Sequence, residues 1–214
     1  MVFEPAASDV LLVTDVQNDF CEAGALPVPQ GSAVVAPINA LIGHFSHVIA
    51  VQDWHPPGHI SFASSHPGSA PYETIELGYG EQRLWPDHCV RGARGAEFHP
   101  SLRTERLEMV LRKGFHREVD SYSAFVENDR TTATGLAGYL RERGIRRLVA
   151  VGLALDYCVR WTVEDARSLG FEAAIVLDAC RAIDEHHFLV DDAAPLRSLG
   201  VDLLTTADIA AGVG

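Results

Sequence analysis

Positive charge, cysteine and long apolar runs are all scarce in this sequence, and each shortage excludes a class of protein. The 214 residues carry a formal net charge of −12 with histidine counted as neutral. This charge repels phosphate backbones and anionic bilayers, so we expect neither a nucleic-acid nor a membrane partner. No apolar run reaches membrane length, and the amino-terminal stretch MVFEPAASDVLLVTD lacks a signal-peptide pattern. We therefore expect a cytoplasmic protein.

Cysteine is too sparse for a disulfide framework. The four cysteines show no CxxC spacing, and they are Cys21, Cys89, Cys158 and Cys180. In a reducing cytosol they would be free thiols, most of them small buried hydrophobic residues. Composition alone leaves open which of them is reactive.

Lysine is nearly absent. Lys113 is the only one, so sixteen of the 17 basic residues are arginine. A lysine kept in such a chain indicates a position that needs a compact point charge, where a planar guanidinium would not fit.

The second half of the chain repeats a helical pattern, a glycine and an apolar strand. The glycines are natural helix ends, because glycine adopts the left-handed conformation found there, and they are Gly144, Gly170 and Gly200. The first half begins in the same way, with the strand VLLVTD, a helix over about 33–45 and the strand HVIAVQ. This alternation predicts one α/β domain over 1–214, a doubly wound and mostly parallel sheet with helices on both faces. Pro195 fits poorly, since it interrupts the last predicted helix.

Three apolar runs each end at a residue with useful chemistry. VLLVTD ends at Asp15, EMVLRK at Lys113 and LVAVGLALDYC at Cys158. The carboxyl ends of parallel strands meet at one edge of the sheet, where open α/β folds bind ligands. An acid, an amine and a thiol are therefore expected to meet, which predicts a nucleophilic site.

Between about Trp54 and Pro100 the periodicity disappears, which predicts an irregular active-site loop over about 54–100. Asp53 and His55 stand two apart where this loop begins, so they project to the same side of an extended backbone. Three loop histidines are candidates to complete a set of oxygen and nitrogen ligands that suits Zn²⁺, Fe²⁺ or Mn²⁺, and they are His59, His66 and His88.

Five segments, in order and spacing, resemble the nicotinamidases of the isochorismatase-like cysteine hydrolase superfamily. The resemblance spans nearly the whole chain and is most specific in DWHPPGHISF, WPDHC and the DYCV turn. It implies hydrolysis of nicotinamide to nicotinate and ammonia, with pyrazinamide as a related candidate substrate. The segments are VTDVQNDFCEAGALPV, VQDWHPPGHISFASSHPG, LWPDHCVRGARGAEFHPSL, RKGFHREVDSYSAF and VGLALDYCVRWTVEDA.

The resemblance implies a catalytic set of Asp15, Lys113 and Cys158, the three residues found at the strand ends. Asp15 would act as general base, and the amides of Ala154 and Cys158 would hold the oxyanion. Asp156 is predicted to be the N-cap of the helix that carries Cys158. Lys113 and the positive end of that helix are both expected to favour the thiolate.

The resemblance also implies one divalent transition metal, with Zn²⁺ favoured over Fe²⁺ and Mn²⁺. Its ligands would be Asp53, His55 and His88, while His59 aligns with a position that binds the metal in only some members. The walls of the pyridine pocket would be Phe20, Trp85 and Tyr122.

One residue departs from the family pattern. Leu155 stands where the family usually has threonine, in a turn with an implied cis peptide bond between Leu153 and Ala154. We expect the turn to form, because an apolar side chain can be packed while the backbone amides keep their direction.

Two other readings compete with the nicotinamidase hypothesis. Within the superfamily the alternatives are an isochorismatase, which lacks the cysteine, and an N-carbamoyl amidase, which lacks the metal motif. From another class, the chain could be a non-catalytic binding module, since a fold alone does not establish function. The sequence is also compatible with a homo-oligomer.

Overall fold

The computed structural model describes residues 3–209, and its centre is a six-stranded sheet in the order β5-β2-β1-β6-β7-β8. Every pair of neighbouring strands is parallel. The first half of the chain winds to one side of β1 and the second half to the other, as predicted for a doubly wound fold. The strands are β1 (Asp9–Thr14), β2 (His47–Asp53), β5 (Met109–Lys113), β6 (Arg147–Leu153), β7 (Glu172–Arg181) and β8 (Val201–Leu204).

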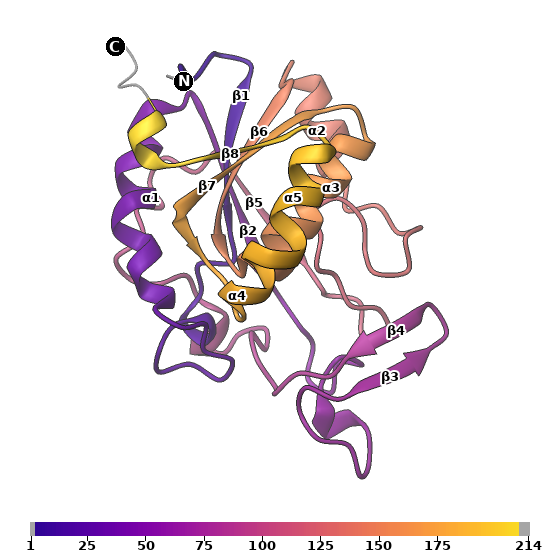
Figure 1. Cartoon of the computed structure of the whole chain (residues 1–214). Coiled ribbons are helices and arrows are strands. Elements are labelled where there is room, and N and C mark those ends of the chain that lie inside the picture. Colours follow the sequence, from indigo (N-terminus) through magenta and orange to yellow (C-terminus); the bar gives the residue numbers. More distant parts are fainter. Residues whose placement is uncertain (1–2, 210–214) are drawn as a thin grey trace.

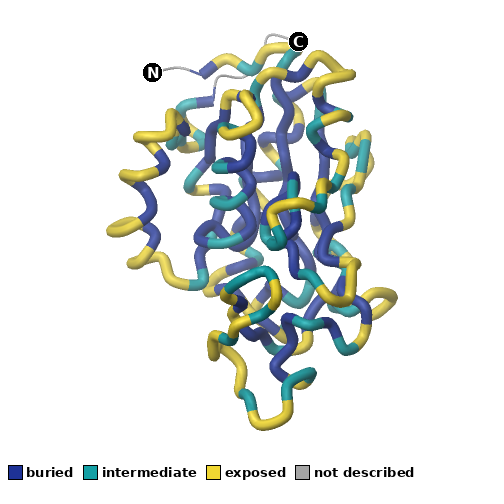
Figure 2. The backbone as a smooth tube through the Cα atoms, turned by 90° about the vertical axis from the view of Figure 1, so that its right-hand side faces the viewer, coloured by how far each residue is buried: buried dark blue, intermediate teal, exposed yellow. Residues whose placement is uncertain are grey.

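Helices cover both faces of the sheet, which confirms the predicted layers (Figure 1). Helix α1 (Val35–Leu41) packs on the face that bears Leu11 and Val13. The opposite face bears Val10 and Leu12 and is covered by the other long helices. These are α2 (Leu136–Glu142), α3 (Arg160–Ser168) and α5 (Ala193–Ser198), with α4 (Glu185–His187) preceding α5. Because successive strand residues point to opposite faces, each strand supplies two cores, and its backbone is buried between them (Figure 2).

The chain leaves each of the helices α2, α3 and α5 through a glycine with positive φ, as predicted; the glycines are Gly144, Gly170 and Gly200. The remaining described elements are short turns. Turns of 3₁₀ type lie at Asn18–Phe20, Gly31–Val34, Ile42–His44, Ala63–Ser65, Arg94–Ala96 and Thr206–Asp208, and π-helical turns at Leu155–Val159 and Phe188–Asp192.

Pro195 does not break the last helix. The π-helical turn Phe188–Asp192 precedes α5, and Pro195 is the third residue of α5. Helix α4, this turn and α5 form one unbroken helical run, so Pro195 lies inside it. The proline removes one N–H donor just after the π-helical turn, where the run already departs from α-helical hydrogen bonding.

The connection from β2 to β5 is the long irregular segment predicted from the sequence, but it also holds a hairpin. Strands β3 (Thr74–Leu77) and β4 (Gly80–Arg83) pair antiparallel and project from the body of the molecule (Figure 1). Periodicity did not predict them, because both strands are only four residues long and only one of their eight residues, Gln82, is buried.

The helices between residues 3 and 209 include none that is both long and apolar enough to cross a membrane.

Candidate active site

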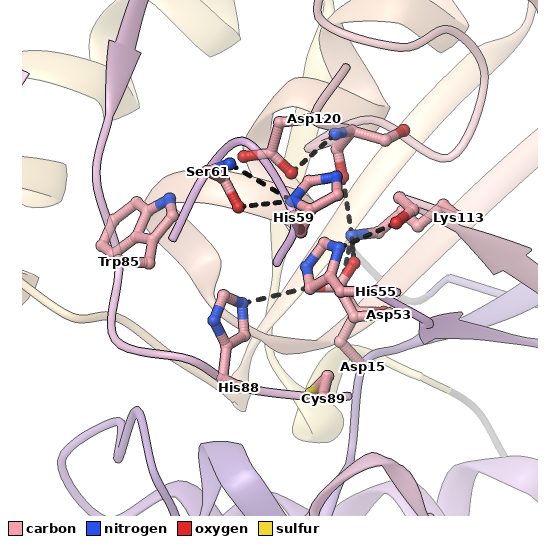
Figure 3. A network of polar contacts seen from close by, with 12 residues as sticks. Asp15, Asp53, His55, His59, Ser61, Trp85, His88, Cys89, Lys113 and Asp120 are labelled. Carbon is pink, nitrogen blue, oxygen red and sulfur yellow. Dashed lines mark hydrogen bonds and ion pairs between the residues drawn. The ribbon is translucent and has the colours of Figure 1, made fainter. Parts of the chain in front are cut away.

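The carboxyl ends of four neighbouring strands bring the predicted residues together, and Figure 3 shows Asp15, Asp53 and Lys113 among them. Asp53 and Lys113 end β2 and β5 and are register partners. Asp15 follows β1 with φ of 48°, a left-handed conformation that turns the chain out of the sheet. Cys158 lies in the π-helical turn after β6. Strands β1 and β6 flank the point where the strand order reverses, which is where open α/β sheets bind ligands.

Lys113 is the centre of this cluster. Its side chain is fully buried, and its ammonium lies 3.0 Å from the Asp15 carboxylate and 3.4 Å from the Cys158 sulfur. It also donates hydrogen bonds to Asp53 Oδ1 and, at 2.9 Å, to the carbonyl of Ser121. The ammonium therefore joins the acid, the thiol and the end of β2 in one network.

The electrostatics of the cluster favour a charged lysine and a neutral thiol. Burial disfavours the Lys113 ammonium, but the carboxylates of Asp15 and Asp53 outweigh burial and raise its pKa well above the usual value. Burial raises the pKa of the Cys158 thiol well above its usual range; Lys113 opposes this shift, and the two carboxylates add to it. Lys113 therefore favours the thiolate, as expected, while burial and the two carboxylates favour the thiol.

Asp15 is suited to accept a proton. Burial raises its pKa to about 6, while Lys113 opposes the shift. Among the described residues, its carboxylate oxygens accept no aligned hydrogen bond, although Lys113 is an ion-pair neighbour. Asp15, Asp53 and the Cys158 sulfur lie with their polar atoms within 4.8 Å of one another. A proton leaving the thiol therefore has an acceptor close by.

Asp53, His55 and His88 form a buried group of the size and type that holds a metal ion. The Nε2 atoms of His55 and His88 lie 3.4 and 3.7 Å from Asp53 Oδ2. Their Nδ1–H groups donate, at 2.8 Å each, to the carbonyls of Gly114 and Pro86. This arrangement directs both Nε2 lone pairs toward Asp53, as in histidines that bind metals. The donor set fits one divalent transition metal.

His59 and His66 have other partners. His59 is buried, and its ring stacks on His55 with centroids 4.3 Å apart. Its Nε2–H points at the carbonyls of His116 and Val119, and its Nδ1 accepts from Ser61. A second possible ligand group does include His59, with His55 and Asp120, but both ring nitrogens are already engaged. His66 instead contacts the carbonyl of Ile60, at 2.7 Å.

One small cavity connects the thiol with the candidate metal group. The predicted wall residues Phe20, Trp85 and Tyr122 all line it. Asp53, His88, Ala154 and Cys158 line the same cavity. A planar ring held between these walls would thus lie beside Asp53 and His88 of the candidate metal group and beside the Cys158 sulfur.

Four further lining residues were not predicted: Leu26, Asp120, Tyr157 and Ile183. Tyr157 packs edge-on against Trp85, with centroids 4.9 Å apart. It lies in the DYCV turn, directly before Cys158. Leu26 and Asp120 also lie in segments that carry the resemblance, and Ile183 lies outside them, but no role was predicted from the sequence for any of the four.

The turn that carries Cys158 differs from the prediction in one detail. The peptide bond between Leu153 and Ala154 is cis, as the resemblance implied, and Leu155 is buried. The prediction that Asp156 is the N-cap is wrong. Its carboxylate instead accepts from the amides of Ile183 and Asp184, at 3.0 and 2.8 Å, because the loop after β7 lies closer than the helix's own first amides.

Comparisons with known proteins agree with this geometry. The model of the isochorismatase domain family matches residues 9–208. A solved nicotinamidase and pyrazinamidase of Acinetobacter baumannii is 47% identical and covers 95% of this chain and 98% of its own, with a TM-score of 0.92. A protein of L. infantum solved in complex with nicotinate is 37% identical, covering 98% and 99%, with a TM-score of 0.86. A pyrazinamidase of Pyrococcus horikoshii solved in complex with zinc is 32% identical, covering 92% and 99%, with a TM-score of 0.75.

Proposed function

Given that the chain belongs to the isochorismatase family, we propose that it is a nicotinamidase, an amidohydrolase that converts nicotinamide to nicotinate and ammonia. The observation that carries the proposal is the shared cavity, in which the Cys158 sulfur and the Asp53 and His88 side chains face one space between aromatic walls. A thiol next to a base and an ammonium suits attack on a carboxamide. The similar nicotinamidase of Acinetobacter baumannii and the similar L. infantum protein solved with nicotinate support nicotinamide as the substrate.

In the first half of the reaction, Asp15 takes the proton of the Cys158 thiol while the sulfur attacks the carboxamide carbon. Lys113 compensates the negative charge that forms on the sulfur, from 3.4 Å. The amides of Ala154 and Cys158 hold the developing oxyanion, a contribution worth about 3 kcal/mol per donor. The carbon–nitrogen bond then breaks, Asp15 returns its proton to the nitrogen, and ammonia leaves a thioester on Cys158.

In the second half, Asp15 takes a proton from a water molecule that attacks the thioester carbon. The carbon–sulfur bond breaks, nicotinate forms, and the proton held by Asp15 restores the thiol. A base that alternates between these states needs a raised pKa, and burial provides it at Asp15.

Asp53, His55 and His88 would hold one divalent metal, for which the zinc complex of the similar pyrazinamidase favours Zn²⁺. When bound, such an ion supplies a Lewis acid for the pyridine nitrogen. Phe20, Trp85 and Tyr122 would orient the pyridine ring, so that its carboxamide reaches the sulfur.

An ammonia-release assay with nicotinamide tests the proposed function. We expect release of ammonia from nicotinamide, and release from pyrazinamide at a rate no higher than that. Binding of either amide without release of ammonia would instead identify a non-catalytic module. Release from an N-carbamoyl substrate but not from nicotinamide would identify the alternative amidase.

His55→Ala and His88→Ala are expected to raise KM strongly and lower kcat, because ring positioning and activation are both lost. Elemental analysis of the unmodified protein should find close to one divalent transition metal per chain, and each variant should lose most of it. His66→Ala is the control, since the side chain of that loop histidine contacts the Ile60 carbonyl and is not part of the candidate metal group. A metal-free preparation with full activity would refute the metal assignment.

Gly114→Ala is expected to displace the His55 ring of the candidate metal group. Gly114 has φ of +64°, and an added Cβ would meet Nδ1 of His55 at 2.7 Å. Gly144→Ala is the matched control, because its φ is +70° but nothing lies within 4 Å of its Cβ position. Both variants should lose about 1–2 kcal/mol of unfolding free energy from the left-handed conformation. Only Gly114→Ala should also lose activity and zinc; equal activities in the two variants would contradict the close contact with His55.

A further inference from the structure

The chain turns out of the sheet at Asp15, so the end of β2 has no β1 strand beside it. The last register pair between β1 and β2 joins Thr14 to Val51. Asp53, two residues further along β2, therefore has no β1 backbone beside it, although it still pairs with Lys113 on the other side. The turn at Asp15 thus removes the β1 backbone from beside Asp53.

The side chain of Gln17 takes the place of the missing strand. Its Oε1 accepts from the Asp53 N–H at 2.8 Å, and its Nε2 donates to the Asp53 carbonyl at 2.9 Å. A primary carboxamide presents one acceptor and one donor side by side, so it can bond the N–H and the C=O of one residue at the same time. Gln17 is fully buried, so no water competes for these bonds.

Gln17 is also anchored away from Asp53. Its Nε2 donates to the carbonyl of Ala96 at 2.9 Å. Gln52, the residue before Asp53, donates to the same carbonyl at 2.8 Å. The two buried glutamine side chains thus share one anchor, but of the two only that of Gln17 bonds Asp53, while that of Gln52 bonds Ala96 and Arg112.

We propose that Gln17 is a positioning residue for the metal group, an inference that rests on the proposed function. Asp53 has to divide its carboxylate between two tasks, because Oδ1 accepts from Lys113 while Oδ2 faces His55 and His88. A shift of the Asp53 backbone would take Oδ2 away from the histidines or Oδ1 away from the ammonium. By bonding both the N–H and the C=O of Asp53, Gln17 holds the Asp53 carboxylate where one oxygen reaches Lys113 and the other faces the two histidines.

The test compares Gln17→Met with Gln52→Met in the full-length, zinc-loaded protein. Methionine keeps the length and approximate volume of glutamine but removes its hydrogen bonds, and both variants lose one bond to Ala96. Zinc affinity is measured by competition with a chromogenic chelator, beside kcat, KM and thermal unfolding. We expect Gln17→Met to bind zinc about 10- to 100-fold more weakly, the usual effect of removing a residue that supports a metal ligand. Gln52→Met should keep its zinc affinity, and both should show similar losses of thermal stability.

Three results overturn the inference. The first is an unchanged zinc affinity in Gln17→Met. The second is a zinc affinity that falls equally in Gln17→Met and Gln52→Met. Either result would mean that Gln17 has only a structural role. His88→Ala serves as the reference for loss of a ligand: if it also keeps zinc, the proposed metal group is wrong and the role of Gln17 falls with it. Should Gln17→Met be too unstable to purify, Gln17→Glu keeps the acceptor for the Asp53 N–H, loses both donors, and is expected to weaken zinc binding as well.

Discussion

Cys158→Ala is expected to hydrolyse no detectable nicotinamide while folding and binding zinc normally. A methyl group can occupy the position of the thiol but cannot attack a carboxamide, and of the four cysteines, all of which lie in the described part of the chain, only Cys158 lines the cavity. Loss of a covalent nucleophile lowers kcat by about 10⁴-fold or more. Ammonia release measures the loss, and zinc content with thermal unfolding shows that the rest of the site is intact.

Cys180→Ala is the matched control, because Cys180 is another buried free thiol, on β7. It should keep nearly full activity, as should Cys21→Ala. Cys89→Ala is less neutral, since Cys89 directly follows His88 and its carbonyl accepts from the His55 amide. If Cys158→Ala retains more than a trace of turnover, the nucleophile lies elsewhere.

Lys113→Arg is expected to lower kcat by about 10²-fold or more, close to the effect of Lys113→Ala, because an electrostatic group must be correctly placed to stabilise a transition state. The substitution keeps the charge but places a larger planar group where the ammonium is fully buried and contacts Asp15, Asp53 and Cys158. A guanidinium has no room to reach all three partners from the same backbone position.

Arg112→Lys is the control for a neighbouring cation. Arg112 stacks on Trp54, 3.8 Å from the ring centroid, and is exposed, so replacing it with lysine should leave kcat unchanged. Full activity in Lys113→Arg would mean that charge alone is needed there. The sole lysine would then be an accident of composition, and Asp15 and Cys158 would have to account for the chemistry without it.

The catalytic end of the sheet could be predicted from the sequence because its residues follow strongly apolar strands. Asp15, Lys113 and Cys158 each end such a run, and parallel topology brings those ends together. Asp53 and His55 were found by the same logic, one strand further along. The alternation of helix, glycine and strand likewise predicted both layers of helices.

The residues that support the site were not predictable, because their partners are distant in the chain. Gln17 reaches Asp53 and Ala96, which are 36 and 79 positions away. Asp156 resembled a helix cap because local spacing cannot reveal that its amide partners lie 27 and 28 residues later. The β3–β4 hairpin was missed for another reason: its polar strands pair with each other and enter no core, so no apolar pattern marks them.

Because Lys113 is buried, its reaction with an amine reagent reports on opening of the catalytic edge of the sheet. Lys113 is the only side-chain amine of the protein, and it is inaccessible and held as an ammonium in the closed structure. An amine-reactive reagent can reach it only when the carboxyl ends of the strands separate, so its labelling rate follows the population of that opened state. Mass spectrometry distinguishes its peptide from the labelled chain terminus. Labelling with and without zinc or nicotinate would therefore measure how much each ligand holds this edge of the sheet shut.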